Sequence, residues 1–158
     1  MNGTKTADFH IVLYQPEIPD NTGAVGRTCV AVGAKLWLVR PLGFQMDHRR
    51  IKRAGLDYWE HLDVQVADDW SDLTQHLSGH RFWFLSKKGN LPYTEAVFRR
   101  KDVFVFGGES RGLPESMLES HKNQSLRIPI HSAARSLNLS VSVGVIAFEF
   151  QRQRKGRL

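Results

Sequence analysis

The stretch VFVFGGESRGLPE, residues 103–115, decides the fold class. A strongly apolar run of five residues, 103–107, continues without a break into a segment with three glycines in six residues, 107–112. Leu113 and Pro114 then begin a helical pattern. A short apolar run is typical of a buried strand, and proline suits the first turn of a helix. The stretch therefore predicts a strand, a loop and a helix of an α/β protein.

Further apolar runs of this kind lie on both sides of the stretch. Together they predict six strands, at residues 10–14, 35–39, 63–67, 81–85, 103–107 and 125–130. Helical segments alternate with them: one opens near Asp20 and runs past Cys29, and others cover residues 68–77 and 113–121. Alternation of this kind predicts a mostly parallel sheet flanked by helices. The 158 residues are expected to form a single domain, 1–158.

Composition limits the classes of partner. The formal net charge is +6, with 22 Lys and Arg against 16 Asp and Glu, so a polyanion is a plausible partner. The one cysteine, Cys29, excludes an internal disulfide and a multi-cysteine metal site, and we expect it in the core. His76 and His80 have metal-pair spacing without a third ligand, so no metal is expected. No apolar run approaches the ~18 residues of a membrane span, which predicts a cytoplasmic protein.

The segment PEIPDNTGAVGRTC, residues 16–29, follows the first predicted strand. Asp20 or Asn21 is expected to cap the helix, and Gly23 and Gly26 leave one side of it without Cβ atoms, so that another group can approach closely. Arg27 follows on the same helix, where the alternative to a functional role is a surface pair with an acid. The spacing G-x-x-G lacks a glycine of the dinucleotide fingerprint, which disfavours NAD binding.

Two other segments expose polar groups. The glycines of 107–112 expose backbone N–H and C=O groups, as a pocket that reads a ligand through the main chain requires, whereas a plain turn needs one glycine. The run ARSLNLSVSV, residues 134–143, alternates like a strand, but its polar members after Arg135 are Ser and Asn. We interpret it as a loop that opens the last helix, with Ser136 or Asn138 as N-cap. The basic tail QRQRKGRL is either a solvated helix end or a segment that contacts RNA or flanks a dimer.

Three ordered motifs resemble the SPOUT superfamily of RNA methyltransferases over essentially the whole chain. They are NTGAVGR (21–27), FGGESRGLP (106–114) and IPIHSAARSLNLSVS (128–142). The short length and KRAGLDYW (52–59) are similar to the minimal TrmL type, whose members methylate the ribose 2′-hydroxyl of the wobble nucleotide, a cytidine or modified uridine, in certain leucine tRNAs. The resemblance implies an α/β-knot fold with a deep trefoil knot near the C-terminus.

The same resemblance implies a bent S-adenosylmethionine held mainly by main-chain groups. The matching cofactor-binding positions are Leu85, Gly107, Ile128, Ser136 and Leu137. A side chain at Gly107 is expected to project toward the cofactor. The resemblance places Arg27 at the reaction centre, holding an RNA phosphate beside the target ribose, with Asn21, Glu109 and Asn138 orienting Arg27 or the ribose. Phe148 stands where relatives often carry tyrosine.

The implied partners are the anticodon stem-loop of a tRNA and a second copy of the chain, without metal or membrane. A homodimer would double the basic surface formed by Arg49, Arg50, Lys52, Arg53 and the tail. Three alternatives stay open: a 2′-O-methyltransferase acting on another tRNA or rRNA site, a non-catalytic RNA-binding module, and a dinucleotide-dependent oxidoreductase. Binding of S-adenosylmethionine or of NAD distinguishes a methyltransferase, a non-catalytic RNA-binding module and an oxidoreductase from one another.

Overall fold

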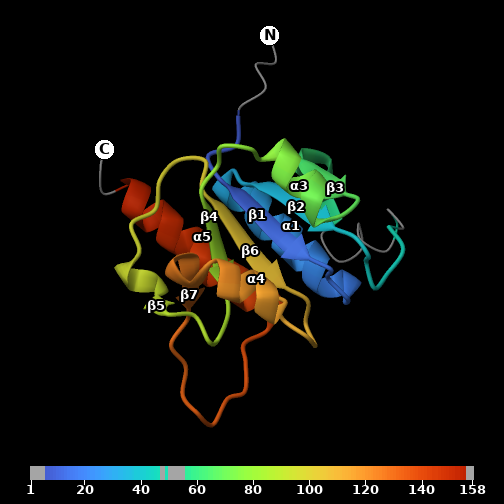
Figure 1. Cartoon of the computed structure of the whole chain (residues 1–158). Helices are drawn as coiled ribbons and strands as arrows, with labels where there is room; N and C mark the ends of the chain where they lie inside the picture. Colours follow the sequence, from blue (N-terminus) through green and yellow to red (C-terminus); the bar gives the residue numbers. More distant parts are fainter. Residues whose placement is uncertain (1–5, 47–48, 50–55, 156–158) are drawn as a thin grey trace.

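Seven parallel strands form one sheet in the computed structural model, which describes residues 6–46, 49 and 56–155. The strand order is β3-β2-β1-β6-β4-β7-β5, and every ladder between neighbours is parallel (Figure 1). The strands are β1 His10–Tyr14, β2 Lys35–Val39, β3 Val64–Ala67, β4 Phe82–Leu85, β5 Leu91–Pro92, β6 Val103–Gly107 and β7 Ser125–Arg127.

The six predicted strands are all present, and the prediction of a parallel α/β sheet is confirmed. The last one ends at Arg127 and not at residue 130, so the run up to Pro129 already belongs to the following loop. A seventh strand, β5, was not predicted. It has two residues, one of them proline, and pairs with β7 through Leu91 and Leu126. Two residues carry no measurable periodicity, which explains why the pattern did not indicate it.

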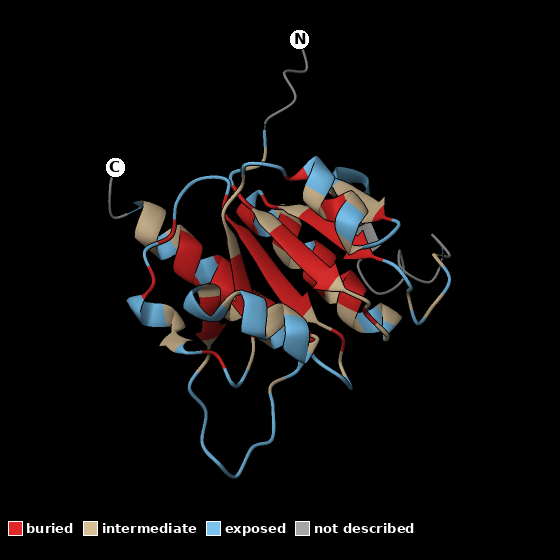
Figure 2. Ribbon diagram, in the orientation of Figure 1, coloured by how far each residue is buried: buried red, intermediate tan, exposed pale blue. Residues whose placement is uncertain are grey.

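Helices cover both faces of the sheet, which gives three layers (Figure 1). Helices α1 (Pro19–Val32) and α5 (Leu139–Lys155) pack on one face, and α3 (Trp70–His76) and α4 (Glu115–Ser120) on the other. Successive strand residues point to opposite faces. In β1, Ile11 and Leu13 therefore join the core under α1 and α5, while Val12 joins the core under α3 and α4. The central strands are buried on both sides (Figure 2). The described residues also form short 3₁₀ turns: η1 Leu56–His61, η2 Tyr93–Glu95 and η3 Lys122–Gln124.

The two long helices begin differently. Helix α5 begins directly after Asn138, whose Oδ1 accepts a hydrogen bond from the Ser140 backbone N–H at 2.8 Å. The prediction of a loop that opens into a helix capped at this position is thus confirmed. Helix α1 begins at Pro19, and its N-cap residue Ile18 provides no side-chain cap. The expectation that Asp20 or Asn21 caps α1 is wrong, because proline at the first position starts the helix earlier.

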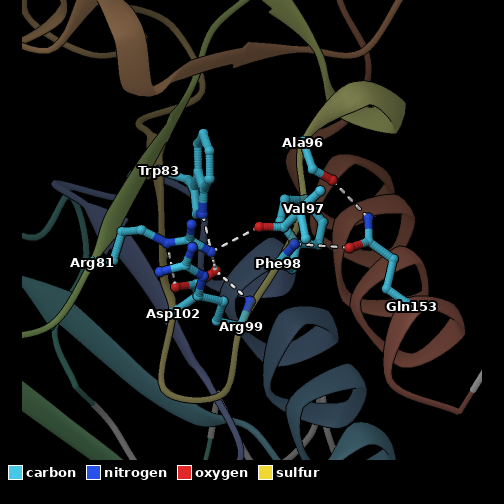
Figure 3. A network of polar contacts seen from close by, with 8 residues as sticks. All are labelled: Arg81, Trp83, Ala96, Val97, Phe98, Arg99, Asp102 and Gln153. Carbon is cyan, nitrogen blue, oxygen red and sulfur yellow. Dashed lines mark hydrogen bonds and ion pairs between the residues drawn. The ribbon is translucent and has the colours of Figure 1, made fainter. Parts of the chain in front are cut away.

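The sheet end at which β6 begins is held by the buried carboxylate of Asp102, which is 2% exposed (Figure 3). It accepts hydrogen bonds from Arg81 Nε at 2.8 Å, Trp83 Nε1 at 3.0 Å and the Arg99 N–H at 2.8 Å. Gln153 of α5 bonds the backbone of the same loop at two further points. A buried charge is tolerated when it is paired and hydrogen-bonded, as it is here. The network anchors the loop before β6 to α5, at the end of the sheet opposite the loop of residues 107–112.

The remaining predictions concern the core and the basic segments. Cys29 is fully buried, and burial raises the pKa of its thiol to about 12, which confirms a core residue. In α5, Arg152 forms two hydrogen bonds with the nearly buried Glu149. Within the described ranges, none of the helices has the length and apolar character needed to cross a membrane. The basic residues Arg50, Lys52, Arg53 and Arg157 lie outside the described residues.

Candidate functional site

A cavity of about 530 Å³ opens at the carboxyl ends of β4 and β6. Its wall includes all five predicted cofactor-binding residues: Leu85, Gly107, Ile128, Ser136 and Leu137. In open parallel sheets, ligands bind outside the carboxyl ends of the strands. The volume lies within the ~300–1,000 Å³ typical of small-molecule sites. Three segments that are far apart in the sequence, following β4, β6 and β7, therefore meet around one space.

The wall combines apolar side chains with exposed backbone. Leu85, Phe106, Ile128 and Leu137 supply the apolar part, and the glycine loop 107–112 supplies main-chain groups. The loop is folded back on itself, because Gly108 and Gly112 form an isolated bridge and the Gly112 N–H donates to the Gly108 carbonyl at 2.9 Å. Apolar walls with a few directed polar groups are suited to a flat heterocycle with a polar edge. The apolar side chains and main-chain groups of this wall fit the adenosine part of S-adenosylmethionine.

Glu109 connects the glycine loop to the start of α1. Its carboxylate accepts hydrogen bonds from the Glu17 N–H at 2.7 Å, the Ile18 N–H at 3.1 Å and Asn21 Nδ2 at 3.3 Å. The first N–H groups of a helix have no partner within the helix. From a loop about ninety residues away, Glu109 satisfies the N–H groups of the two residues that precede α1, and a carboxylate at this end also interacts favourably with the helix dipole.

Asn21 extends the connection to the last helix. Asn138 Nδ2 donates to Asn21 Oδ1 at 3.1 Å, while Asn138 Oδ1 accepts from Ser140. Glu109, Asn21 and Asn138, three of the four predicted catalytic residues, thus form one continuous hydrogen-bonded chain that lines the cavity. The chain fixes both amides in one orientation, because each uses its oxygen and its nitrogen for a different partner.

Arg27, the fourth predicted catalytic residue, lies outside this group. It is exposed on α1, does not line the cavity, and its guanidinium carbon lies 4.8 Å from the centroid of the Tyr58 ring. Six residues separate it from Asn21, which corresponds to about 9 Å along a helix and roughly 120° around it. The contact is a cation–π interaction. Among the residues that the structure describes, Arg27 does not form the alternative, a surface pair with an acid. Within one chain, Arg27 therefore lies outside the cavity wall.

Gly107 does not act as expected, whereas the expected close approach is seen at Gly26. A Cβ atom on Gly107 would overlap the backbone of Gly112 and Leu113, so the expectation that a side chain there projects toward the cofactor is wrong. The absence of a side chain lets the loop fold back on the end of β6. At Gly26 a Cβ would lie 2.9 Å from Leu62 Cδ2. Close approach at Gly26 thus serves packing of α1 against the protein itself.

Sequence reasoning missed Glu17, whose carboxylate, like that of Glu109, accepts hydrogen bonds from the opposite loop. The Glu17 carboxylate accepts hydrogen bonds from Ser110, from the backbone N–H at 3.1 Å and from Oγ at 2.7 Å. The Ser110 hydroxyl, then its N–H, hold the pKa of Glu17 below its usual range, with a smaller contribution from Arg111. No local pattern marks Glu17, because its partner lies more than ninety residues away; its place between two prolines, Pro16 and Pro19, was the available sign of a fixed loop.

The histidines of the described residues are engaged in ring contacts or exposed. The His80 ring lies edge-on to His10 at 5.1 Å, and the His76 ring lies 5.4 Å from that of Trp37. His131 is exposed in the loop before α5. In the part of the chain that the structure describes, no group of three or more His, Cys, Asp or Glu side chains is placed to hold a metal ion.

Residues 8–148 match the SpoU rRNA Methylase family. A tRNA (cytidine(34)-2′-O)-methyltransferase of Methylovorus glucosotrophus is 45% identical over 146 residues, which cover 92% of this chain and 95% of that protein. A solved structure described as giving structural insights into the 2-OH methylation of C/U34 on tRNA is 48% identical, with a TM-score of 0.90 over 94% of this chain and 97% of that one. The AdoMet-bound rRNA methyltransferase of Sinorhizobium meliloti is 26% identical, with a TM-score of 0.81 over 92% of this chain and 56% of that one.

Proposed function

This chain belongs to the SpoU rRNA Methylase family and is an S-adenosylmethionine-dependent RNA methyltransferase, and we propose that it methylates the ribose 2′-hydroxyl of the wobble nucleotide in leucine tRNAs. The support for position 34 is the similarity to relatives that carry this activity in their names. The net charge of +6 suits a polyanionic substrate. The choice of leucine tRNAs, with cytidine or a modified uridine as the target, rests on the motif resemblance. We propose that the enzyme works in the cytoplasm.

The cavity is our proposed cofactor site. When bound there, S-adenosylmethionine supplies a methyl group that its sulfonium has already activated. Leu85, Ile128 and Leu137 would pack against its flat and apolar parts, and the backbone of Gly107 and Ser136 would contact its polar edges. The hydrogen-bonded chain from Glu109 through Asn21 to Asn138 would hold these walls at a fixed separation. For this reaction the main task of the protein is alignment of the hydroxyl with the methyl group.

Arg27 is our proposed contact to the RNA phosphate beside the target ribose. Its planar fork can bind two phosphate oxygens, whereas its proton is effectively never lost, which makes it unsuited as the base. Because Arg27 does not line the cavity of its own chain, we propose that it serves the cavity of a second copy in a homodimer. Exposed apolar residues on or near α1 and α5 support such a contact: Ile18, Tyr58, Val141 and Phe148 are 39–59% exposed. At Phe148 no hydroxyl is available for catalysis.

The trefoil knot is a further proposal. We propose that the segment after β7 threads through an earlier loop before α5 begins, as in the superfamily that the motifs resemble. Its support is that this segment, the loop after β4 and the glycine loop line one cavity.

The observation that carries the proposed function is the meeting of five predicted cofactor positions in one cavity beside the Glu109–Asn21–Asn138 chain. Isothermal titration calorimetry with S-adenosylmethionine, S-adenosylhomocysteine and NAD tests it, with and without tRNA. We expect binding of the first two and no heat with NAD. Binding of RNA, with no binding of S-adenosylmethionine or S-adenosylhomocysteine, would favour a non-catalytic RNA-binding module.

A further inference from the structure

We propose that Glu17 is a positioning residue of the methyl-transfer site, which holds the glycine loop against the start of α1 through Ser110. The proposal rests on the proposed function, since the site it positions is the proposed cofactor cavity. Glu17 itself does not line the cavity, so it acts through its partner.

The contact is reciprocal. Glu17 accepts hydrogen bonds from both the N–H and the hydroxyl of Ser110, at 3.1 Å and 2.7 Å. In return the residue before Ser110, Glu109, accepts from the N–H groups of Glu17 and Ile18 at 2.7 Å and 3.1 Å. Two adjacent residues of one loop and two adjacent residues of the other thus exchange charge-assisted hydrogen bonds, which are stronger than neutral ones. We call this set of bonds the clasp.

The clasp lies at the rim of the cavity. Ile18 and Asn21 line the cavity on the α1 side, and Ser110 and Arg111 line it on the side of the glycine loop. The bonds between Glu17 and Ser110 therefore tie one wall of the cavity to the other. Without them the glycine loop keeps the bridge at its base, Gly108 with Gly112, and the hydrogen bonds that Glu109 accepts, but Ser110 loses its link to the segment before α1. A ligand that contacts both walls would then have to order the loop as it binds, which lowers affinity.

The loop that carries Glu17 is itself fixed by backbone packing. A Cβ on Gly43 would lie 2.7 Å from Glu17 Cα, and a Cβ on Gly108 would lie 2.7 Å from the Gln15 carbonyl oxygen. The Gly43 N–H also donates to the Pro16 carbonyl at 2.9 Å. Removing the Glu17 carboxylate leaves these contacts in place. We therefore expect the variants to fold, and the effect to be confined to the glycine loop.

The experiment compares Glu17→Ala, Ser110→Ala and the double variant with Glu119→Ala. The control removes an exposed carboxylate that pairs with Lys122 at 2.9 Å, on α4 and away from the cavity wall. Calorimetry measures the Kd for S-adenosylhomocysteine. Amide hydrogen exchange of the ligand-free proteins measures protection of residues 107–112, and thermal unfolding reports global stability.

We expect the Kd to rise roughly five- to thirtyfold in each single variant, as loss of a charge-assisted hydrogen bond predicts, and no further in the double variant. Exchange should accelerate in residues 107–112 alone, with melting temperatures close to that of Glu119→Ala. Unchanged Kd and exchange, additive effects, or a general loss of protection would each overturn the clasp. A wild type that binds no S-adenosylhomocysteine would overturn the proposed function, and with it the role of Glu17 at a cofactor site. The exchange data test the clasp independently of ligand binding.

Discussion

Asn138, the residue before the last helix, donates a hydrogen bond to Asn21 in the first helix across 117 positions of sequence. The same Asn138 caps α5, and the same Asn21 donates to Glu109 in the glycine loop. One polar chain thus sets the relative positions of the three motifs by which the family is recognised. Its geometry explains why asparagine, which has both a donor and an acceptor, occupies both positions.

Asn138→Asp separates the two roles of Asn138. The carboxylate can still accept from Ser140 and cap α5, but it cannot donate to Asn21. We expect melting temperatures near that of the wild type and a methyl-transfer rate at least tenfold lower. Asn138→Ala should lose the cap as well, at about 1 kcal/mol of stability. Thermal unfolding and single-turnover methyl transfer are measured in parallel. An Asp variant as active as the wild type would show that the bond to Asn21 has no catalytic importance.

Arg27→Ala should strongly slow methyl transfer while leaving the affinity for S-adenosylmethionine nearly unchanged, because Arg27 does not line the cavity of its own chain. Loss of one aligned, charge-assisted contact in a desolvated site costs ~2 to 4 kcal/mol, or roughly thirty- to a thousandfold in rate. Arg27→Lys should be almost as damaging, since a point charge cannot replace a planar fork.

The control for Arg27 is Arg100→Ala, which removes an exposed arginine that pairs with Asp8 at 3.1 Å. The assay is transfer of labelled methyl to unmodified leucine tRNA in a single turnover. A wild-type rate for Arg27→Ala would leave Arg27 with its contact to Tyr58 alone and would remove it from the proposed catalytic residues.

Gly107→Ala should destabilise the fold itself. The added methyl group would overlap the backbone of Gly112 and Leu113, which cannot move aside as a flexible side chain can. Gly144→Ala in α5 is the matched control, because a Cβ there meets nothing within 4 Å of the chain and alanine is the better helix former by about 1 kcal/mol. Circular dichroism and thermal unfolding compare the two. A Gly107 variant with native stability that fails to bind cofactor would restore the original expectation for this position.

His10 should make the protein less stable in mild acid. Burial, followed by the charges of His80 and Lys35, lowers the pKa of His10 from 6.5 to about 4 in the folded state. Between these two pH values the unfolded chain binds a proton that the folded one does not, so stability falls as pH drops from 6.5 toward 4. The shift sets an upper bound of about 3 kcal/mol, reduced by partial exposure.

Chemical denaturation across this pH range tests the effect of His10. His10→Asn keeps an acceptor for the indole N–H of Trp37, which donates to His10 Nδ1 at 3.2 Å, and should flatten the pH dependence. His131→Asn, at an exposed site, should leave it unchanged. Equal slopes for the wild type and His10→Asn would contradict this role.

Sequence patterns predicted the sheet because its strands are continuous apolar runs, such as 103–107, that are buried on both faces. The same patterns placed α3, α4 and the start of α5 correctly. They missed β5, which is too short to have a period, and the hydrogen bonds of Glu109 to the segment before α1, about ninety positions away. Local patterns contain no information on such long-range partners.

The candidate site was also predicted only in part, because some of its contacts join residues that are far apart in the sequence. The resemblance brought together Leu85, Gly107, Ile128, Ser136 and Leu137, and the cavity contains all five. It did not indicate Glu17, whose role depends on a contact between two loops. The predicted direction of a side chain at Gly107 was wrong, because this direction depends on how the loop 107–112 folds back.

The most direct test of the central claim is mass spectrometry of the nucleosides of a leucine tRNA after incubation of the unmodified transcript with purified protein and S-adenosylmethionine. Digestion into oligonucleotides locates the added mass. The account predicts one methyl group on the ribose of nucleotide 34, formed roughly thirty- to a thousandfold more slowly by Arg27→Ala. Methylation of a base or methylation at another position would contradict it. So would the absence of methylation both on the transcript and on tRNA that carries its other natural modifications.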